Sequence, residues 1–356
     1  MLSDLKKIIY LIEQNLSKIE KPNIMEVCGT HTMALSKTGI RDLFKNKINF
    51  ISGPGCPVCV THEKYIDYIY ELSLYKDVII ATYGDMIRVP GTHPDKSLEK
   101  SRALGGNIKI VYSSMDALKL ALENKNKCIV FLAIGFETTA PSSAVVIREA
   151  CKRKIENFKI LSMHRRIKPI MTQLLSEKDI NIHSFLCPGH VAAVIGERGF
   201  KFLEYYDKPG VIAGFEREEL LYSIFKITEK LKNKDYSLEN CYKSIVRPEG
   251  NTEAVKAINE TFTAATDCWR GIGEVRDGAL KLKEEFREFD IEHYYPMKSF
   301  EDKSNENLCA CGEILKGKLS PLQCPLFRKK CNPLNPIGPC MVSQEGSCAA
   351  YYRYCY

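Results

Sequence analysis

Cysteine is the residue type in this chain best suited to chemistry, because its thiolate is both a nucleophile and a metal ligand. The 356 residues include 15 cysteines, of which seven lie near the end, at Cys309, Cys311, Cys324, Cys331, Cys340, Cys348 and Cys355. The segment 309–356 is poor in aliphatic residues, so it cannot bury enough apolar surface to fold alone. It needs a staple, for which disulfides, zinc and an iron–sulfur cluster are the candidates.

The spacing of these cysteines helps to separate the three candidates. Zinc modules usually bring their ligands in close Cys-x2–4-Cys pairs, whereas the only tight pair here is Cys309-x-Cys311. The compact ferredoxin run of four cysteines is also absent. A [4Fe–4S] cluster needs four thiolates but no fixed spacing, and Cys309, Cys324, Cys331 and Cys348 could supply them. The spacing therefore favours a cluster, with zinc and disulfides as the alternatives.

Two further thiol motifs follow predicted strands in the first part of the chain. Cys56-Pro-Val-Cys59 opens a helix, where the backbone dipoles lower the pKa of one thiol and make it nucleophilic and able to bind metal. The alternative is a pair of buried small residues, which would not need the tight turn 53–55 before it. Cys28 occupies the equivalent place one unit earlier, with His31 near it. It is either a thiolate ligand or nucleophile, or a core cysteine.

Charged residues at other strand ends are further candidates. Glu137, in the turn 135–139, could serve the chemistry or belong to a helix cap. His190 also lies at a strand end, where the alternative is a core histidine. The basic turn 164–166 could bind an anion or a partner, or could simply be solvated.

Each of these motifs follows a predicted strand. Four strand–turn–helix units have strands at 23–27, 48–52, 78–82 and 108–112, and four more have strands at 128–134, 158–163, 182–187 and 211–213. This pattern predicts an α/β fold with two small parallel-sheet domains, each with helices on both faces, facing each other across a cleft. Ligands of such sheets bind beyond the carboxyl ends of the strands, so we expect the motifs to share one rim.

The same pattern sets the expected domain boundaries. An apolar stripe at helical spacing makes 1–21 an N-terminal helix, which we expect to pack on the C-terminal domain. The first α/β domain is predicted to cover 22–125 and the second 126–237. The remainder, 238–356, is predicted to be a mostly helical domain that binds the iron–sulfur cluster. Its helices are expected at 249–263 and 279–289, before the cysteine-rich tail.

Composition and charge argue against some classes of function. The 51 basic and 44 acidic residues leave a net charge of +7, spread without the Lys/Arg stripe of a nucleic-acid footprint. The longest apolar run, 128–136, is too short to span a bilayer, and residues 1–20 show no export pattern. We therefore expect a cytoplasmic protein that binds neither nucleic acid nor membrane. In that reducing compartment, clustered cysteines indicate metal or redox chemistry.

Together the motifs resemble those of the HypD family of [NiFe]-hydrogenase maturation factors over nearly the whole chain. The resemblance is carried by Cys28-Gly-Thr-His-Thr32, Gly53-Pro-Gly-Cys-Pro-Val-Cys59, Gly135-Phe-Glu-Thr-Thr139, Pro188-Gly-His-Val191 and Gly338-Pro-Cys-Met-Val-Ser-Gln-Glu-Gly-Ser-Cys348. It implies a scaffold for an Fe(CN)2CO fragment that works with the small chaperone HypC. Cyanide would arrive through HypE and HypF, and the iron group would pass to the hydrogenase large subunit.

The resemblance also implies roles for individual residues. Cys28 would be an iron ligand shared with a HypC cysteine, and Cys56 and Cys59 would form the exchange dithiol. Glu137 and His190 could donate or relay protons in the cleft.

In the tail, the resemblance implies a cluster with a second thiol pair beside it. The [4Fe–4S] ligands would be Cys309, Cys324, Cys331 and Cys348, and the redox-active pair would be Cys311 and Cys340. An alternative function is an iron–sulfur thiol–disulfide reductase that acts through Cys56 and Cys59 on a protein partner. A zinc-stapled binding module is a third. Whether the chain is an enzyme with turnover or mainly an assembly scaffold stays open at this point.

Overall fold

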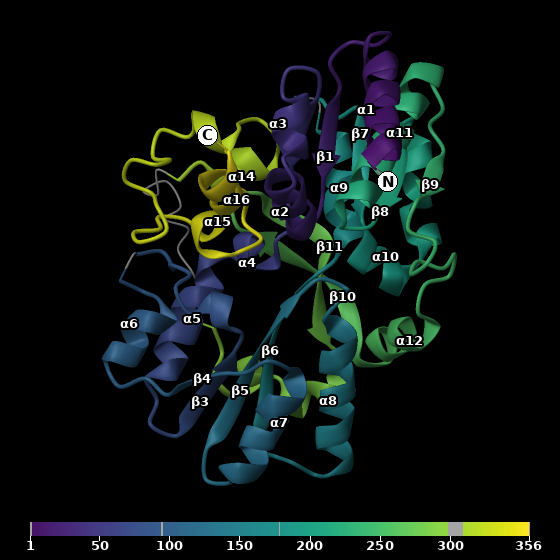
Figure 1. The fold of residues 1–356 in the computed structure, drawn as a ribbon. Coiled ribbons are helices and arrows are strands. Elements are labelled where there is room, and N and C mark those ends of the chain that lie inside the picture. Colours follow the sequence, from purple (N-terminus) through teal and green to yellow (C-terminus); the bar gives the residue numbers. More distant parts are fainter. Residues whose placement is uncertain (1, 94, 178, 298–308, 356) are drawn as a thin grey trace.

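The computed structural model describes residues 2–93, 95–177, 179–297 and 309–355, which form two sheets surrounded by helices (Figure 1). The first sheet has five parallel strands in the order β2-β1-β7-β8-β9. These strands are β1 (Asn23–Glu26), β2 (Asn49–Ser52), β7 (Ser184–Pro188), β8 (Gly210–Ala213) and β9 (Leu238–Asn240). Strands such as β7 and β8 are buried along their whole length, as expected for a parallel sheet covered on both faces.

The second sheet has six strands in the order β10-β11-β6-β5-β3-β4. They are β3 (Val78–Thr82), β4 (Ile108–Ile110), β5 (Cys128–Gly135), β6 (Phe158–Arg165), β10 (Phe262–Trp269) and β11 (Gly273–Leu282). The first four of these run parallel to one another, whereas β10 and β11 form an antiparallel hairpin that pairs antiparallel with β6. The prediction of an α/β fold with two sheets built mainly of parallel strands is therefore confirmed.

The assignment of strands to the two sheets differs from the prediction. The predicted domains 22–125 and 126–237 would put β1 to β4 in one sheet and β5 to β8 in the other. Instead β1 pairs with β7, and β3 pairs with β5, so the chain crosses between the sheets after β2 and again after β6. Buried parallel strands have similar apolar patterns, and these patterns predict a strand but do not identify its neighbours.

The helices follow the strands, as a βα pattern requires, and cover both sheets. Around the first sheet lie α1 (Leu2–Leu16), α2 (Gly29–Lys37), α3 (Ile40–Phe44), α10 (Gly189–Ile195), the 3-10 helix η2 (Glu197–Tyr206) and α11 (Arg217–Asn233). Near the second sheet lie α5 (Glu63–Ser73), the 3-10 helix η1 (Gly84–Met86), α6 (Leu98–Ala103), α7 (Ser114–Glu123), α8 (Ala140–Lys152) and α12 (Thr252–Thr261). Helix α9 (Ile167–Ser176) lies between the two sheets, in contact with β11 of the second and η2 of the first. None of the described helices is long and apolar enough to cross a membrane.

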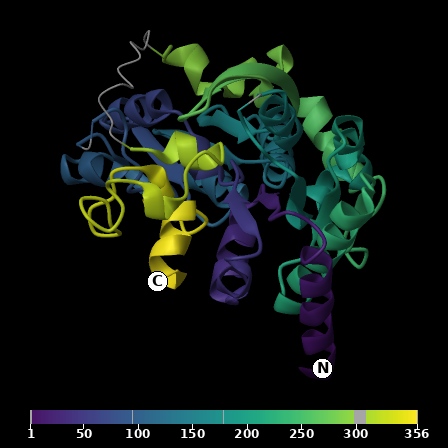
Figure 2. The same cartoon turned by 90° about the horizontal axis from the view of Figure 1, so that it is seen from above.

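The N-terminal helix does not pack where the sequence analysis placed it. Ile12 and Leu16 of α1 are buried in the core of the first sheet, and Asn15 of α1 donates a hydrogen bond to Thr228 of α11. Figure 2 shows α1 apart from the C-terminal tail, with α2 and α3 between them. The apolar stripe of α1 predicted a packed helix correctly, but it could not identify the packing partner.

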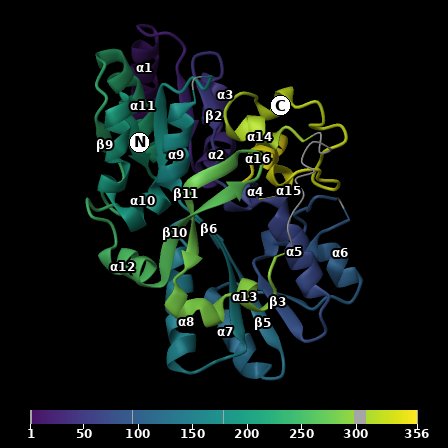
Figure 3. The same ribbon diagram turned by 180° about the vertical axis from the view of Figure 1, so that it is seen from behind.

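The region after residue 238 contains more strand than predicted. Strand β9 completes the first sheet, and the predicted helix 279–289 is instead the end of β11 followed by the 3-10 helix η3 (Glu284–Phe289) and α13 (Ile291–Tyr294). Ala279 and Leu280 pair with β6, and this tertiary pairing overrides the helix propensity of the segment. The predicted helix 249–263 is observed as α12. Figure 3 shows the hairpin extending from the second sheet toward the tail.

The tail is a series of short helices and turns packed against the first part of the chain. Its elements are α14 (Cys311–Leu315), the 3-10 helix η5 (Pro321–Gln323), α15 (Pro339–Val342) and α16 (Ser347–Tyr354). A buried arginine of α3, Arg41, pairs with Glu26 at the end of β1 and donates a 2.9 Å hydrogen bond to Tyr351 of α16. The tail is therefore held against the sheet that carries Cys28, and its apolar residues join the same core.

Candidate functional site

A cavity of about 280 Å3 lies where carboxyl ends of strands from both sheets meet. From the first sheet it is lined by segments that follow β1, β2 and β7, including Cys28, Thr30 and His190. From the second sheet it is lined by segments that follow β3 and β5, including Asp85 and Thr139. Glu345 of the tail completes the lining. The motifs therefore meet in a cleft between two sheets rather than on the rim of one.

Cys28 is the thiol that faces this cleft. It precedes α2 in an extended conformation and is 8% exposed. Burial, followed by the nearby Glu345, raises the pKa of its thiol to about 11. Gly55 explains the tight turn of the Gly-Pro-Gly motif, because a Cβ there would lie 2.3 Å from the backbone nitrogen of Cys28. The turn after β2 can thus lie directly against the Cys28 backbone.

Two carboxyl groups that the sequence analysis did not select also line the cleft. Thr30 donates a 2.8 Å hydrogen bond to Glu345, and burial raises the pKa of both Asp85 and Glu345. Asp85 follows β3, so the strand-end rule could have identified it. Glu345 comes from the tail, and no local pattern indicates that the tail reaches this cleft.

The two predicted histidines lie on either side of one aromatic ring. His190 lines the cleft and stacks on Phe215 with 4.0 Å between ring centroids, while His31 stacks on the same ring at 4.6 Å. His31 is fully buried, its Nε2 lies 3.0 Å from the Gly214 carbonyl oxygen, and burial lowers its pKa to about 4. It is therefore a neutral imidazole behind the cleft wall, and only His190 faces the cavity.

Glu137 does not line the cavity. Both of its carboxyl oxygens accept hydrogen bonds from the backbone nitrogen of Ile167, at 3.0 and 3.3 Å, at the start of α9. Burial raises its pKa to about 7. This geometry supports the second interpretation of Glu137, that of a helix-capping group. The helix that it caps is α9, whereas the helix that follows it in sequence is α8.

Cys56 and Cys59 form a disulfide at the short helix α4 (Pro57–Val60), with 5.3 Å between their Cα atoms. Both residues are buried. Their neighbours Gly55, Pro57 and Val58 line the cleft, whereas the Cys56 sulfur lies 3.4 Å from the hydroxyl oxygen of Ser343 in the tail. The pair therefore lies between the cleft and the tail.

Six of the seven tail cysteines line one small cavity. Its thiol lining consists of Cys309, Cys311, Cys324, Cys331, Cys340 and Cys348. The rest of the lining is apolar and includes Leu326, Phe327 and Met341. Cys355 does not line it. Within the described ranges, no three or more Cys, His, Asp or Glu side chains are already arranged as a metal-binding group.

The surroundings of these sulfurs suit a cation. Burial, followed by the sulfurs of Cys309 and Cys311, raises the pKa of Cys348 well above its ordinary value, because several thiolates cannot ionise together in an apolar cavity. The Cys331 sulfur accepts a 3.4 Å hydrogen bond from the backbone nitrogen of Ile337. A Cβ at Gly338 would lie 2.4 Å from the Cys309 sulfur, so only glycine leaves room for that sulfur. A bound cation would offset the repulsion between the thiolates.

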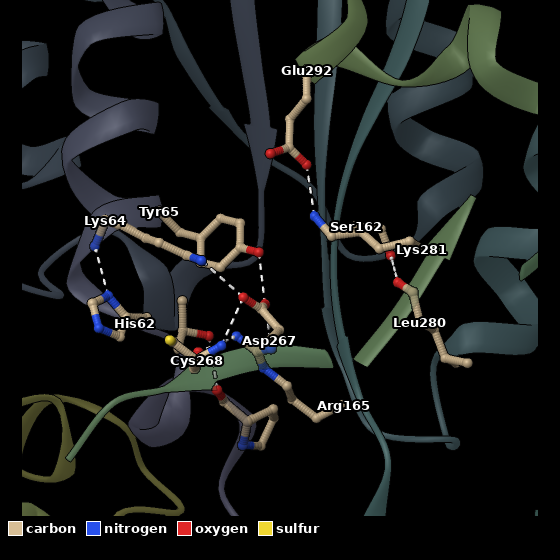
Figure 4. A network of polar contacts seen from close by, with 12 residues as sticks. His62, Lys64, Tyr65, Ser162, Arg165, Asp267, Cys268, Leu280, Lys281 and Glu292 are labelled. Carbon is tan, nitrogen blue, oxygen red and sulfur yellow. Dashed lines mark hydrogen bonds and ion pairs between the residues drawn. The ribbon is translucent and has the colours of Figure 1, made fainter. Parts of the chain in front are cut away.

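The basic turn 164–166 is largely used within the protein. Arg165 is fully buried and donates a 2.6 Å hydrogen bond to Asp267, which also accepts from Tyr65 at 2.6 Å and from Lys64 at 2.9 Å (Figure 4). His164 is buried beside the Ser143 hydroxyl. These contacts join β6, α5 and β10, so Arg165 and His164 have structural roles and are not an exposed anion site.

The fold and the site together define a class: an α/β protein with a thiol in a cleft between two sheets and a thiol-rich tail packed beside it. The family model of HypD, described as "Hydrogenase formation hypA family", matches residues 3–355. The chain therefore belongs to the HypD family of hydrogenase maturation factors.

Curated relatives agree over most of their length. The chain is 41% identical to a putative hydrogenase expression/formation protein of Methanocaldococcus jannaschii, covering 98% of this chain and 97% of the relative. It is 40% identical to hydrogenase maturation factor HypD of Escherichia coli, covering 94% and 90% of the two chains. For HypD of Cupriavidus necator the identity is 39%, with 94% and 90% covered.

Proposed function

We propose that this protein is the scaffold on which the Fe(CN)2CO group of [NiFe] hydrogenase is assembled. The observation that carries the proposal is the cleft, in which a single buried thiol, Cys28, is surrounded by hydroxyl, carboxyl and imidazole groups from both sheets and the tail. Membership of a family of hydrogenase maturation factors supplies the biological context.

In the cleft, Cys28 would bind the iron through its sulfur. Low-spin iron with cyanide and carbon monoxide favours soft thiolate donors, and a metal offsets the burial that otherwise keeps this thiol protonated. Burial raises the pKa of both Asp85 and Glu345, and in its protonated form either carboxyl group could donate a hydrogen bond to a cyanide nitrogen. His190 is the imidazole placed to accept or donate a proton there.

In the tail, we propose that Cys309, Cys324, Cys331 and Cys348 hold a [4Fe–4S] cluster. Four thiolates in an apolar cavity, one of them accepting a backbone N–H, are a donor set that suits such a cluster. When bound, the cluster would supply electrons. Cys311 and Cys340 line the same cavity and would form the redox pair beside the cluster. Cys56 contacts Ser343 of the tail, so the Cys56–Cys59 disulfide would be the next thiol group toward the cleft.

The partners follow from the same proposal. A HypC-type chaperone would supply the second thiolate to the iron in the cleft, HypE and HypF would deliver cyanide, and the hydrogenase large subunit would receive the product. We further propose that this work takes place in the cytoplasm, where thiols stay reduced.

The test of the scaffold is maturation by single-cysteine variants. Cys28→Ala should abolish production of active hydrogenase in a strain that lacks its own HypD. The matched control is Cys187→Ala, another buried cysteine, which lies in β7 and should leave maturation intact. Normal maturation by a folded Cys28→Ala protein would overturn the scaffold proposal.

The cluster is tested separately by iron, sulfide and zinc analysis of protein purified without oxygen. Cys324→Ala should lose most of the iron and sulfide, whereas Cys355→Ala, whose sulfur lies outside the cavity, should retain them. Zinc in place of iron and sulfide would show that the tail is a zinc staple.

A second candidate function is a thiol–disulfide reductase, which is favoured by the disulfide Cys56–Cys59 next to the tail thiols. Catalytic reduction of a model protein disulfide by the isolated chain, lost in Cys59→Ser but not in Cys28→Ala, would support this alternative.

A further inference from the structure

Ser343 brings a buried hydroxyl to the disulfide from the tail. It follows α15, is 1% exposed, and its oxygen lies 3.4 Å from the Cys56 sulfur. The same oxygen accepts a 3.2 Å hydrogen bond from the backbone nitrogen of Glu345. A serine hydroxyl has one proton to donate and two lone pairs. Since the Glu345 N–H uses a lone pair, the proton remains for the sulfur, which carries no hydrogen of its own in the disulfide.

The two sulfurs of the pair therefore have different surroundings. Cys56 accepts from the hydroxyl of Ser343 and also from the backbone nitrogen of Cys59, at 3.2 Å. Across the described part of the chain, no hydrogen bond reaches the sulfur of Cys59, which is fully buried. Hydrogen bonds to sulfur stabilise the thiolate more than the thiol or the disulfide, because the donors interact with a full negative charge.

We propose that Ser343 is a positioning residue that makes Cys56 the thiolate of the reduced pair. Cys56 is then the sulfur that attacks, and Cys59 is the sulfur that resolves the mixed disulfide. The inference goes beyond the proposed function, since it concerns the pair itself and holds whether or not iron is the cargo. It also means that the tail controls the reactivity of a dithiol that lies 287 residues away in sequence.

The exchange steps balance with two reactants, dithiothreitol as the reductant and a target disulfide as the oxidant. Dithiothreitol reduces the pair by breaking the sulfur–sulfur bond, supplying two electrons and closing to its own cyclic disulfide. The Cys56 thiolate then attacks a target disulfide, forms a mixed disulfide and releases one thiolate. Cys59 gives up its proton to the solvent, attacks the Cys56 sulfur and releases the second thiolate, which restores the Cys56–Cys59 bond.

The first experiment measures the equilibrium of the pair in full-length protein equilibrated without oxygen in mixtures of reduced and oxidised dithiothreitol. Ser343→Ala should lower the equilibrium constant for reduction about tenfold, which corresponds to about 30 mV. Ser343→Thr keeps the hydroxyl and should stay within about threefold of the wild type. Ser347→Ala, another buried serine of the tail, is the matched control and should show no change.

The second experiment follows alkylation of the reduced protein by iodoacetamide as a function of pH, with peptide mass analysis. In the wild type, Cys56 should react before Cys59, with a midpoint below the ordinary cysteine value of about 8.5. The midpoint should rise in Ser343→Ala. Fluorescence of the single tryptophan, the buried Trp269, reports whether each variant is folded.

Either of two results would overturn the inference. One is preferential alkylation of Cys59 in the wild type, which needs no variant and therefore decides the matter even if Ser343→Ala fails to fold. The other is a folded Ser343→Ala protein with the wild-type equilibrium constant and the wild-type pH midpoint at Cys56.

Discussion

At the scale of single residues, burial determines which protonation states the site can use. Cys28, His31 and Glu137 are each nearly inaccessible to solvent, and burial shifts the pKa of each toward the uncharged form. For Glu137 this shift coincides with a helix-capping contact rather than with a place in the cleft. We therefore assign Glu137 a structural role in this fold and leave proton transfer in the cleft to groups that line it.

The raised pKa of Glu137, about 7 against an ordinary 4.5, makes a prediction about stability. Between these values the folded protein binds more protons than the unfolded chain. The stabilisation is therefore complete below about pH 4.5 and is lost as the pH rises through about 7, by roughly 3 kcal/mol in all. Glu137→Gln should remove this loss and be more stable than the wild type at pH 8, measured by urea denaturation at several pH values.

The same variant distinguishes a structural role of Glu137 from a catalytic one. Glu137→Gln should support hydrogenase maturation at or near the wild-type level, because the side chain does not reach the cavity. A stable, folded Glu137→Gln protein that fails in maturation would show that the carboxyl acts in the chemistry.

At the scale of elements, the β10–β11 hairpin joins parts of the molecule that are distant in sequence. Its bulge at 265–267 directs Asp267 toward Arg165 of β6 and toward Lys64 and Tyr65 of α5, the helix that follows the Cys56–Cys59 turn. At the hairpin turn, Arg270 donates its backbone N–H to the Val60 carbonyl at the end of α4. The hairpin thus holds the segment that carries the Cys56–Cys59 pair in place.

Asp267→Asn should therefore be strongly destabilising. It removes the only carboxylate partner described for the fully buried Arg165, and breaking such a pair costs about 3–5 kcal/mol. Chemical denaturation would measure this loss. Glu249→Gln, which removes the exposed partner of Arg198, should change the free energy of unfolding by less than about 1 kcal/mol.

The pH dependence gives a second check on this network. Burial alone would raise the pKa of Asp267, but Arg165, Lys64 and Tyr65 outweigh it and hold the pKa below its ordinary value. The wild type should therefore lose this contribution as the pH falls below about 4, whereas Asp267→Asn should not. Equal acid sensitivity of the two proteins would contradict the role of Asp267.

Within the tail, Gly338→Ala tests whether the thiol cavity needs the space that glycine leaves beside the Cys309 sulfur. The added methyl group would collide with the Cys309 sulfur, so that sulfur must move from its present position. Iron and sulfide per chain should fall several-fold. In Gly84→Ala the nearest atom would be 3.9 Å away, and the content should be unchanged. An undiminished content in Gly338→Ala would show that Cys309 does not hold the cluster from this position.

The observed helices and strands show how much of the fold could be predicted from the sequence. The apolar runs predicted strands and the turn motifs predicted strand ends, and Cys28 and His190 do lie at strand ends. The runs could not predict that β1 pairs with β7, or that α1 packs on α11. A pattern of apolar residues shows which face of an element is buried, but it does not show which other element packs against that face. Glu345 was missed since its place depends on long-range packing of the tail, which Arg41 and Tyr351 hold in position.

At the scale of the whole molecule, the two sheets and the tail each contribute to the cleft, and no one of them would form it alone. Cys28 comes from one sheet, Asp85 from the other, and Glu345 from the tail. The Cys56–Cys59 pair lies where these three parts meet, with Ser343 on the tail side and Pro57 on the cleft side. In the function proposed above, the Cys56–Cys59 pair would carry electrons from the thiols of the tail to the iron in the cleft.

The most direct test is an infrared spectrum of the protein purified without oxygen together with its HypC-type partner, from cells that contain the cyanide-delivery proteins. The scaffold account predicts cyanide and carbon monoxide bands in the wild type that disappear in Cys28→Ala, while the iron and sulfide of the tail remain. A wild-type protein with its cluster but without these bands, or a Cys28→Ala protein that keeps them, would contradict it.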